Sequence, residues 1–229
     1  MATALLVAAG SGERLGVGSP KALVELAGEP MIAWSMRSLA ASEAVIAVVV
    51  AAPARHEARI DAVAREAAPT LPLQVVTGGS SRSESVRSAL SAAGSAEVVL
   101  VHDAARPLAR PDLFDLCVNE LERFDCDGVV AAVPVTDTIK TVDADRRVTD
   151  TLDRSTLWAV QTPQAFRATV LGEALAGAND LGAVTDDAQL VERIGGDVRI
   201  APARPDNIKV TVPADLKLAE LLVADGDAD

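Results

Sequence analysis

The sequence predicts an α/β protein built on a mainly parallel, twisted sheet with helices on both faces. Two observations carry this prediction. Short β-branched, apolar runs alternate along the chain with longer segments rich in Ala, Leu, Glu and Arg, which is the order of strands and helices in such folds. The expected strands are also apolar nearly throughout, as is usual when helices cover both faces of a sheet.

The elements follow one another in a regular order for most of the chain. Strands are expected where the short apolar runs occur, at 4–8, 45–51, 73–76, 97–101, 128–134 and 198–201. Helices are expected between them and after them, at 32–41, 55–67, 81–93, 111–124, 165–178, 186–194 and 213–223. Pro111 suits the first turn of its helix, where a missing N–H costs nothing.

One stretch, residues 137–160, breaks this order. Its sequence DTIKTVDADRRVTDTLDRSTLWAV alternates polar and β-branched residues around a turn-like DADR, which is typical of a β-hairpin with little apolar surface of its own. Two such strands are marginally stable alone in water, so they are expected to pack on something. The pattern leaves two interpretations open, a hairpin lying on its own domain and an arm that embraces a second subunit.

Composition limits the class of protein. The 229 residues are 49% hydrophobic, which suits a single domain spanning 1–229. The net charge of −12 argues against a surface that coats nucleic acid, so a site for a polyanion has to be a local basic pocket. Cys117 and Cys126 are too few for a disulfide framework and suggest a reducing compartment. No apolar run reaches the length of a membrane span, so a soluble, cytoplasmic protein is expected.

The loop after the first strand is the strongest local signal. The chain there reads TALLVAAGSGERLGVGSPKALVELAG, in which small residues surround two cations, Arg14 and Lys21. Ligands of open parallel sheets bind beyond the carboxyl ends of the strands. Glycines let backbone N–H groups approach phosphate oxygens, and the cations neutralise charge on a leaving pyrophosphate. A flexible surface loop with solvated cations is the alternative interpretation of this segment alone.

Known phosphate-loop motifs do not describe this loop. The spacing of Gly10, Gly12 and Gly16 departs from GxGxxG, and no Gly-Lys-Ser/Thr follows, so neither the dinucleotide fingerprint nor the P-loop applies. A looser GxxxGxG fits at Gly12, Gly16 and Gly18 and hints at a short-chain dehydrogenase. That family implies a catalytic tyrosine, and the sequence contains no tyrosine.

Other strand ends carry polar clusters as well. TGGSSRSESV follows the third strand, HDAARPL follows the fourth, and RPDNIKVT brings Lys209 near another strand end. Asp103 sits where a carboxylate can hold Mg²⁺ against phosphates. We interpret His102 as a packed, hydrogen-bonded residue rather than a base. Asp186 and Asp187 are interpreted as a helix N-cap region rather than as second metal ligands.

Eight motifs together resemble a known family. They are LLVAAGSGERLG, SPKALVELAGEPMI, GGSSRSESVRSAL, VHDAARP, TDTIK, WAVQTPQAF, TDDAQLVE and DNIKVTVPADL, in the order in which the family has them. The chain from about residue 4 to residue 222 resembles the 2-C-methyl-D-erythritol 4-phosphate cytidylyltransferases of the non-mevalonate isoprenoid pathway. The resemblance implies a Rossmann-like nucleotidyltransferase fold with a protruding β-hairpin arm, and a transfer of the cytidylyl group from CTP to the sugar-alcohol phosphate.

The resemblance also implies roles for individual residues. The catalytic cations would be Arg14, Lys21 and Lys209. The nucleotide-binding residues would be Ala8, Ala9, Gly10, Gly12, Gly78, Gly79 and Ser85. The acceptor-binding residues would be Asp103, Arg106, Thr138, Arg154, Thr162 and Thr185, and Asp103 would also contact Mg²⁺. Ser80 stands where some relatives carry an acidic residue, which leaves the role of that position open.

The resemblance further implies a homodimer in which the arm crosses to the partner, so that Thr138 and Arg154 complete the neighbouring acceptor site. Because the acceptor phosphate is already an anion, the transfer requires alignment and charge neutralisation rather than a general base. Two rivals remain at this point, a ribitol 5-phosphate cytidylyltransferase and a non-catalytic nucleotide-binding regulator. Cations at both ends of the transferred group favour catalysis over simple binding.

Overall fold

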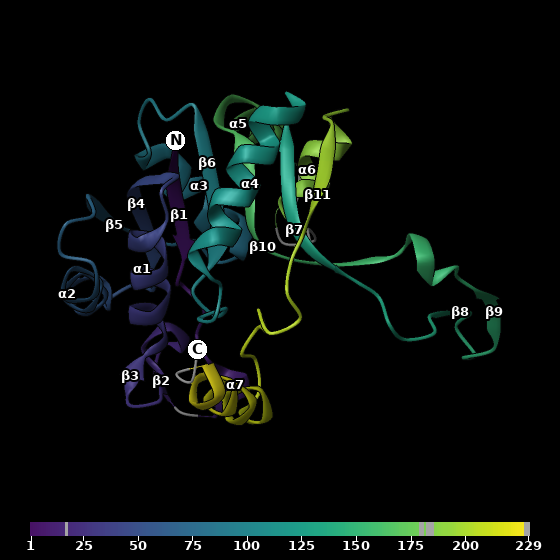
Figure 1. The fold of residues 1–229 in the computed structure, drawn as a ribbon, viewed down its shortest axis with the longest axis horizontal. Coiled ribbons are helices and arrows are strands. Elements are labelled where there is room, and N and C mark those ends of the chain that lie inside the picture. The colour runs from purple at the N-terminus through teal and green to yellow at the C-terminus, as the bar shows by residue number, and fades with distance from the viewer. Residues whose placement is uncertain (17, 179–180, 182–185, 227–229) are drawn as a thin grey trace.

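A seven-stranded sheet forms the centre of the molecule in the computed structural model, which describes residues 1–16, 18–178, 181 and 186–226 (Figure 1). The strand order is β11-β7-β10-β6-β1-β4-β5. The strands are β1 (Ala2–Val7), β4 (Val45–Ala52), β5 (Leu73–Thr77), β6 (Val98–Asp103), β7 (Gly128–Pro134), β10 (Trp158–Arg167) and β11 (Val198–Pro202). The pairs are parallel except where β10 lies antiparallel between β6 and β7, so the predicted mainly parallel α/β sheet is confirmed.

Helices cover both faces of the sheet, and the strand period of two explains why. Leu6 and Leu100 point to one face, where they pack with α1 (Met31–Ala41), α2 (Glu57–Ala67) and α4 (Pro111–Phe124). Leu5 and Val101 point to the other face, where they pack with α3 (Arg82–Ala92), α5 (Ala168–Gly177) and α6 (Ala188–Arg193). Burial on both faces accounts for the almost continuous apolar runs in the sequence.

A third apolar cluster joins the two ends of the chain. Leu15, Val24, Leu26, Met31, Val210 and Ala219 are buried together. They belong to the glycine-rich loop with its short helices η1 (Glu13–Leu15) and η2 (Lys21–Leu23), to the small hairpin β2 (Glu25–Leu26) and β3 (Glu29–Pro30), to the first residue of α1, and to the terminal helix α7 (Pro213–Gly226) with the segment before it. Figure 1 shows α7 beside this hairpin. The cluster therefore holds the segment that carries Lys209 next to the loop that carries Arg14 and Lys21.

The sheet register brings four strand ends to one edge. Val7 at the end of β1 is paired with Asp103 on β6 and with Ala51 on β4, and Ala52 is paired with Thr77 on β5. The loops that follow these strands must therefore begin side by side. This edge is where the sequence places its glycines, its serines and its cations.

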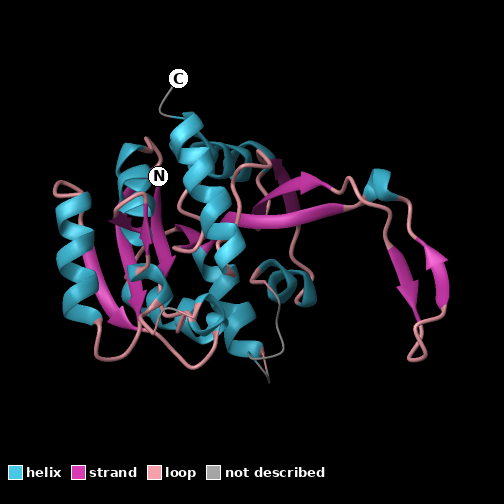
Figure 2. Ribbon diagram, turned by 90° about the horizontal axis from the view of Figure 1, so that it is seen from below, coloured by secondary structure: helices cyan, strands magenta, loops and turns pink. Residues whose placement is uncertain are grey.

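The residues between β7 and β10 project away from the sheet in both views (Figures 1 and 2). β8 (Lys140–Val142) and β9 (Val148–Thr151) pair with each other in a separate two-stranded sheet, and η3 (Arg154–Thr156) follows them. Every residue of β8 and β9 is exposed, so the hairpin does not lie on its own domain. The predicted hairpin is confirmed, although residues 158–160 belong to β10 rather than to it.

One expected helix start is wrong and one strand was missed, both for the same reason. The expected helix 165–178 begins only at Ala168, and the strand β10 that precedes it was not predicted. Its residues Gln164, Ala165 and Phe166 pair antiparallel with both β6 and β7. An antiparallel strand inserted into a parallel sheet does not follow the helix-strand alternation on which the expectation was based.

Candidate active site

A cavity of about 700 Å³ lies at the aligned strand ends. Loops after β1, β5 and β6 and the segment before α7 all contribute to it. Its lining residues are Val7, Ala8, Ala9, Gly10, Ser11, Gly12, Glu13, Arg14, Lys21, Ala22, Gly79, Ser80, Ser81, Arg82, Ser85, Asp103, Ala104, Ala105, Lys209 and Thr211. This volume is in the range of cofactor-sized and nucleotide-sized sites.

The glycine-rich loop folds back on itself at the rim of this cavity. Gly12 has a φ of +77°, and a Cβ at this position would lie 2.7 Å from the carbonyl oxygen of Ser19. Only glycine therefore fits this turn. The amide of Lys21 donates to the carbonyl of Gly10 over 3.1 Å, which closes the loop and brings Lys21 back to the cavity that Ala8, Ala9 and Gly10 line.

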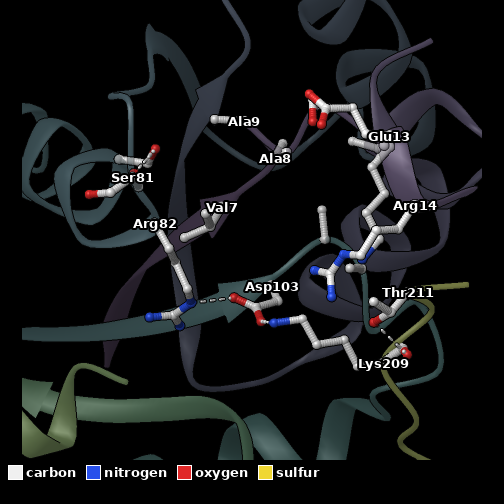
Figure 3. A pocket seen from close by; sticks show the side chains of 18 of the residues that line it. Val7, Ala8, Ala9, Glu13, Arg14, Ser81, Arg82, Asp103, Lys209 and Thr211 are labelled. Carbon is white, nitrogen blue, oxygen red and sulfur yellow. Dashed lines mark hydrogen bonds and ion pairs between the residues drawn. The ribbon is translucent and has the colours of Figure 1, made fainter. Parts of the chain in front are cut away.

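Among the residues that the structure describes, four cations line the same cavity, and three of them are the ones that the sequence predicted. Arg14 comes from η1 and Lys21 from η2. Lys209 comes from the segment after β11, and Figure 3 shows it on the same side of the cavity as Arg14. Burial is the largest cause that lowers the pKa of Lys21 from its ordinary value to about 8, and the neighbouring charges of Lys209 and Arg14 also lower it, against the opposite effect of Asp103. Lys21 is therefore still protonated at neutral pH, but its ammonium group is destabilised until an anion arrives.

Asp103, the last residue of β6, is the carboxylate at which two of the cavity's cations meet. Lys209 Nζ lies 2.6 Å from its Oδ2, and Arg82 Nε lies 2.9 Å from its Oδ1 (Figure 3). Burial disfavours ionisation of Asp103, but the charges of Arg82 and Lys209 outweigh burial and hold its pKa well below the usual range. The carboxylate is therefore permanently charged.

The start of α3 forms the opposite wall. Ser81 is the N-cap, its Oγ accepts from the amide of Glu84 over 3.1 Å, and Glu84 completes a capping box. The carboxylate of Glu84 also accepts from the amide and hydroxyl of Ser80, so an acidic side chain does reach position 80 from the next turn. This contact gives Ser80 a local structural role.

Gly78 and Gly79 allow the chain to approach closely here. A Cβ on Gly78 would lie 2.5 Å from Ala9 Cβ, and one on Gly79 would lie 2.2 Å from Glu84 Cβ. Ser85 Oγ accepts from the amide of Gly79 and donates to the carbonyl of Ser81. Gly79 and Ser85 line the cavity, whereas Gly78 lies behind Ala9 and is absent from the lining.

His102 and Thr162 form a buried hydrogen-bonded unit beneath Asp103. The carbonyl of Arg106 can only accept, so His102 Nε2 carries the proton and donates to it over 3.2 Å. The Thr162 hydroxyl then donates to His102 Nδ1 over 3.1 Å and accepts from the amide of Asp103. Burial lowers the pKa of His102 to about 4, so it is neutral, as the interpretation of a packed histidine expects.

The expected acceptor residues are thus spread over different places. Asp103 lines the cavity, whereas Thr162 is only 4% exposed and lies behind it. Arg106 is close by, and its Nη1 donates to the carbonyl of Asn207 over 2.7 Å. Thr138 lies between β7 and β8 and Arg154 begins η3, so both belong to the projecting hairpin region, where Arg154 Nη1 donates to the carbonyl of Thr136. Thr185 lies outside the described residues.

Sequence reasoning missed two charged residues that line the cavity, Glu13 and Arg82. Arg82 follows the N-cap Ser81 directly and binds both Asp103 and Asp187. Asp186 accepts from the amide of Gln189 over 2.9 Å and so caps the first turn of α6, as interpreted from sequence, whereas Asp187, which precedes α6 directly, makes no capping hydrogen bond with its side chain. The sequence signal that could have identified Arg82 is its positive charge, since a cation in the first turn of a helix opposes the helix dipole and needs a partner.

The residues fit a magnesium ion that arrives with a nucleotide. No group of three potential ligand side chains gathers anywhere in the part of the chain that the structure describes. Mg²⁺ in nucleotide sites is usually held by one or two carboxylates together with phosphates and water. Asp103 supplies one such carboxylate, which the ion would share with Arg82 and Lys209. Among the described helices, none has the length and apolar character that a membrane crossing needs.

The sequence is similar to those of known proteins over nearly its whole length. A family model described as 2-C-methyl-D-erythritol 4-phosphate cytidylyltransferase matches residues 2–225. Relatives of that name are 48% identical in Parasynechococcus marenigrum, covering 96% of both chains, and 47% identical in Rhodococcus jostii, covering 97% of this chain and 95% of the relative.

Solved structures agree with the sequence relatives. The 4-diphosphocytidyl-2C-methyl-D-erythritol synthase of Anaerococcus prevotii superposes with a TM-score of 0.85 at 26% identity and covers 98% of both chains. The 2-C-methyl-D-erythritol 4-phosphate cytidylyltransferase of Thermus thermophilus superposes with a TM-score of 0.76 at 31% identity, over 97% of this chain and 98% of the other. With the family model, the relatives and the fold in agreement, the chain belongs to the 2-C-methyl-D-erythritol 4-phosphate cytidylyltransferase family.

Proposed function

We propose that the chain transfers the cytidylyl group of CTP to 2-C-methyl-D-erythritol 4-phosphate, giving 4-diphosphocytidyl-2-C-methyl-D-erythritol and pyrophosphate. The observation that carries this proposal is the meeting of Arg14, Lys21 and Lys209 in one nucleotide-sized cavity. The names of its relatives supply the substrates. Cations from three segments suit a reaction that brings a triphosphate and a phosphate monoester into contact.

The nucleotide is proposed to lie along the glycine-rich loop. Backbone groups of Ala8, Ala9, Gly10 and Gly12 face the triphosphate, and Arg14 and Lys21 neutralise it. The cytosine lies at the start of α3, near Gly78, Gly79 and Ser85. Gly79 and Ser85 support this placement because they line the cavity, and Gly78 supports it by letting Ala9 pack closely.

The reaction is proposed to be an in-line attack. An oxygen of the acceptor phosphate forms a bond to the α-phosphorus of CTP, and the bond from that phosphorus to the bridging oxygen of pyrophosphate breaks. Lys209 moves from Asp103 toward the α-phosphate, while Arg14 and Lys21 stabilise the charge on the leaving group. No base is required, which agrees with a His102 that is neutral and has both ring nitrogens engaged.

The acceptor is proposed to bind beside Asp103. The carboxylate contacts its hydroxyl groups, with Arg106, Thr162 and Thr185 on the same side. Thr162 contributes through the amide of Asp103 and through His102, since its hydroxyl is engaged with both. Mg²⁺, held by Asp103 and the phosphates, would supply further charge neutralisation when bound.

The projecting hairpin region is proposed to be the arm of a homodimer. Val142 and Val148 are 53% and 55% exposed on a two-stranded sheet that is marginal by itself, which favours burial against a second copy. Thr138 and Arg154 then reach the partner's acceptor site. The remainder of the chain acts as one catalytic domain. The two buried free thiols support a cytoplasmic location.

The proposed activity predicts which substrates react. Purified protein with Mg²⁺ should release pyrophosphate from CTP only when 2-C-methyl-D-erythritol 4-phosphate is present, and UTP and ATP should react far more slowly. Coupled detection of pyrophosphate measures this. Faster turnover with ribitol 5-phosphate would contradict the proposed acceptor, and release that needs no acceptor would contradict the transfer.

The cations predict a second result. Lys21→Ala and Lys209→Ala should each lower kcat by roughly a hundredfold or more, since each removes charge stabilisation from a leaving or transferred phosphate. Lys217→Ala, which removes an exposed lysine of α7, is the matched control and should keep its activity. Circular dichroism checks that each variant is folded, and a near-normal kcat in a folded Lys21 or Lys209 variant removes that residue from the mechanism.

The dimer predicts that two inactive variants restore each other. In a mixed dimer of Lys21→Ala and Arg154→Ala subunits, the cavity of the Arg154→Ala subunit still has its Lys21. It also receives an unaltered hairpin arm from the Lys21→Ala subunit, so that one site is native. Random mixing should therefore make about one quarter of all sites native. The two variants are co-expressed and the pyrophosphate release of the mixture is compared with that of each parent.

A matched mixture serves as the control for this test. Lys21→Ala and Lys209→Ala each alter the cavity of their own subunit and leave the arm unchanged, so their mixed dimers should contain no native site. Equal recovery in the two mixtures, or no recovery in the first one, argues against an arm that crosses between subunits.

A further inference from the structure

We propose that Arg82 and Asp187 form a positioning pair that fixes the Asp103 carboxylate and thereby sets how Lys209 is presented to the cavity. This inference rests on the proposed function and adds two positioning residues to it. It starts from a row of alternating charges in which each side chain contacts the next, namely Lys209, Asp103, Arg82 and Asp187.

The contacts within this row of charges are short, and the side chains that make them are mostly shielded from solvent. Lys209 Nζ is 2.6 Å from Asp103 Oδ2, Arg82 Nε is 2.9 Å from Asp103 Oδ1, and Arg82 Nη1 is 2.5 Å from Asp187 Oδ2. The Asp187 side chain is fully buried, and that of Arg82 is 24% exposed. The row of charges links the end of β6, the start of α3, the start of α6 and the segment after β11.

Arg82 occupies a position that a cation disfavours on its own. It is the first residue of α3, and the capping box of Ser81 and Glu84 fixes its backbone. The positive end of the helix dipole repels a guanidinium group there. Two carboxylates reverse this preference, and together they hold the pKa of Arg82 above its usual value despite its burial.

Asp187 has Arg82 as its sole cationic partner among the described residues. Its Oδ1 is buried and has no hydrogen-bond partner in the part of the chain that the structure describes. A buried carboxylate with so little compensation contributes poorly to stability, because desolvation offsets the attraction. Its position behind Arg82 instead suits orientation, since the guanidinium group is held between two carboxylates and cannot turn toward Lys209.

The consequence for the cavity concerns Lys209. With Arg82 on Oδ1, Asp103 shares its charge between two cations, and its second oxygen faces Lys209 in one orientation. Without a fixed Arg82, the carboxylate is free to rotate and Lys209 alone balances it. Lys209 would then be held more tightly and less well aimed when the α-phosphate arrives, and misplacement of about 1 Å can lower a rate by roughly a hundredfold.

The test uses Asp187→Asn, Arg82→Gln and the double variant. Asp187→Asn keeps the size of the side chain and makes the surroundings of the cavity more positive by one charge. Positioning predicts that kcat falls about tenfold or more while the KM for CTP changes less than about threefold. It also predicts that the double variant is no slower than the slower single variant, because the two residues act as one unit.

A matched control is available one residue away. Asp186→Asn removes the same charge from a carboxylate that caps α6 and does not contact Arg82, and an asparagine still caps a helix. Its kcat should stay within about twofold of that of the unchanged chain, since it leaves the pair intact. Urea unfolding of every variant, and assays at a temperature where each is folded, separate loss of stability from loss of rate.

Pyrophosphate binding gives a readout that needs no acceptor. Measured by calorimetry at fixed Mg²⁺, Asp187→Asn should bind pyrophosphate as well as or better than the unchanged chain, even though its kcat is lower. The proposal is overturned if folded Asp187→Asn keeps its kcat. It is also overturned if the double variant, which restores the net charge, recovers full activity, because charge balance alone would then explain the pair. Absence of cytidylyl transfer by the unchanged chain would instead refute the proposed function.

Discussion

Repulsion among the positive charges at one edge of the sheet is the constraint on which the rest of the site depends. Arg14, Lys21 and Lys209 share a cavity in which Lys21 is buried enough, and close enough to the others, for its pKa to fall to about 8. Such an arrangement does not help folding, because each charge is easier to solvate alone. A polyanion that enters the cavity would relieve this repulsion, so we expect the cost that the free chain carries to favour the binding of phosphates.

Apolar packing holds the segments that carry these charges next to one another. The buried cluster of Leu15, Val24, Leu26, Met31, Val210 and Ala219 joins the glycine-rich loop to the segment that carries Lys209. The amide of Val210 donates to the carbonyl of Ala105 over 2.8 Å, which fixes this segment beside the loop after β6. Asp103 then offsets part of the positive charge from the end of a central strand, where it has little freedom to move.

Much of this arrangement could be predicted from the sequence, because it follows from patterns within single segments. The parallel strands, the hairpin and the glycine-rich loop each have a local signature. Strand β10 could not be recognised in the same way, since Ala165 and Phe166 extend because β6 and β7 accept them on both sides. Its residues also resemble the start of the helix that follows, and tertiary pairing overrides such weak preferences.

The site shows the same division. Arg14, Lys21, Asp103 and Lys209 were predicted from their places at strand ends. The role of Arg82 could not be predicted, because its partner Asp187 lies 105 residues away and no local sequence pattern links the two. The interior position of the Thr162 hydroxyl also depends on a residue distant in the sequence, His102, which lies on the neighbouring strand β6. Residues on the hairpin region raise a different difficulty, because their expected contacts lie on another copy of the chain.

Direct titration of Lys21 tests the central claim. The chain contains four lysines, so the Nζ-linked carbons can be labelled with ¹³C, assigned with single Lys→Arg variants and followed by NMR as the pH is raised. In the free protein Lys21 should lose its proton near pH 8, well below its ordinary value of 10.5, and saturating pyrophosphate should move its pKa upward because the anion stabilises the charged form. A Lys21 that titrates near 10.5 in the free protein and does not respond to pyrophosphate would contradict the account.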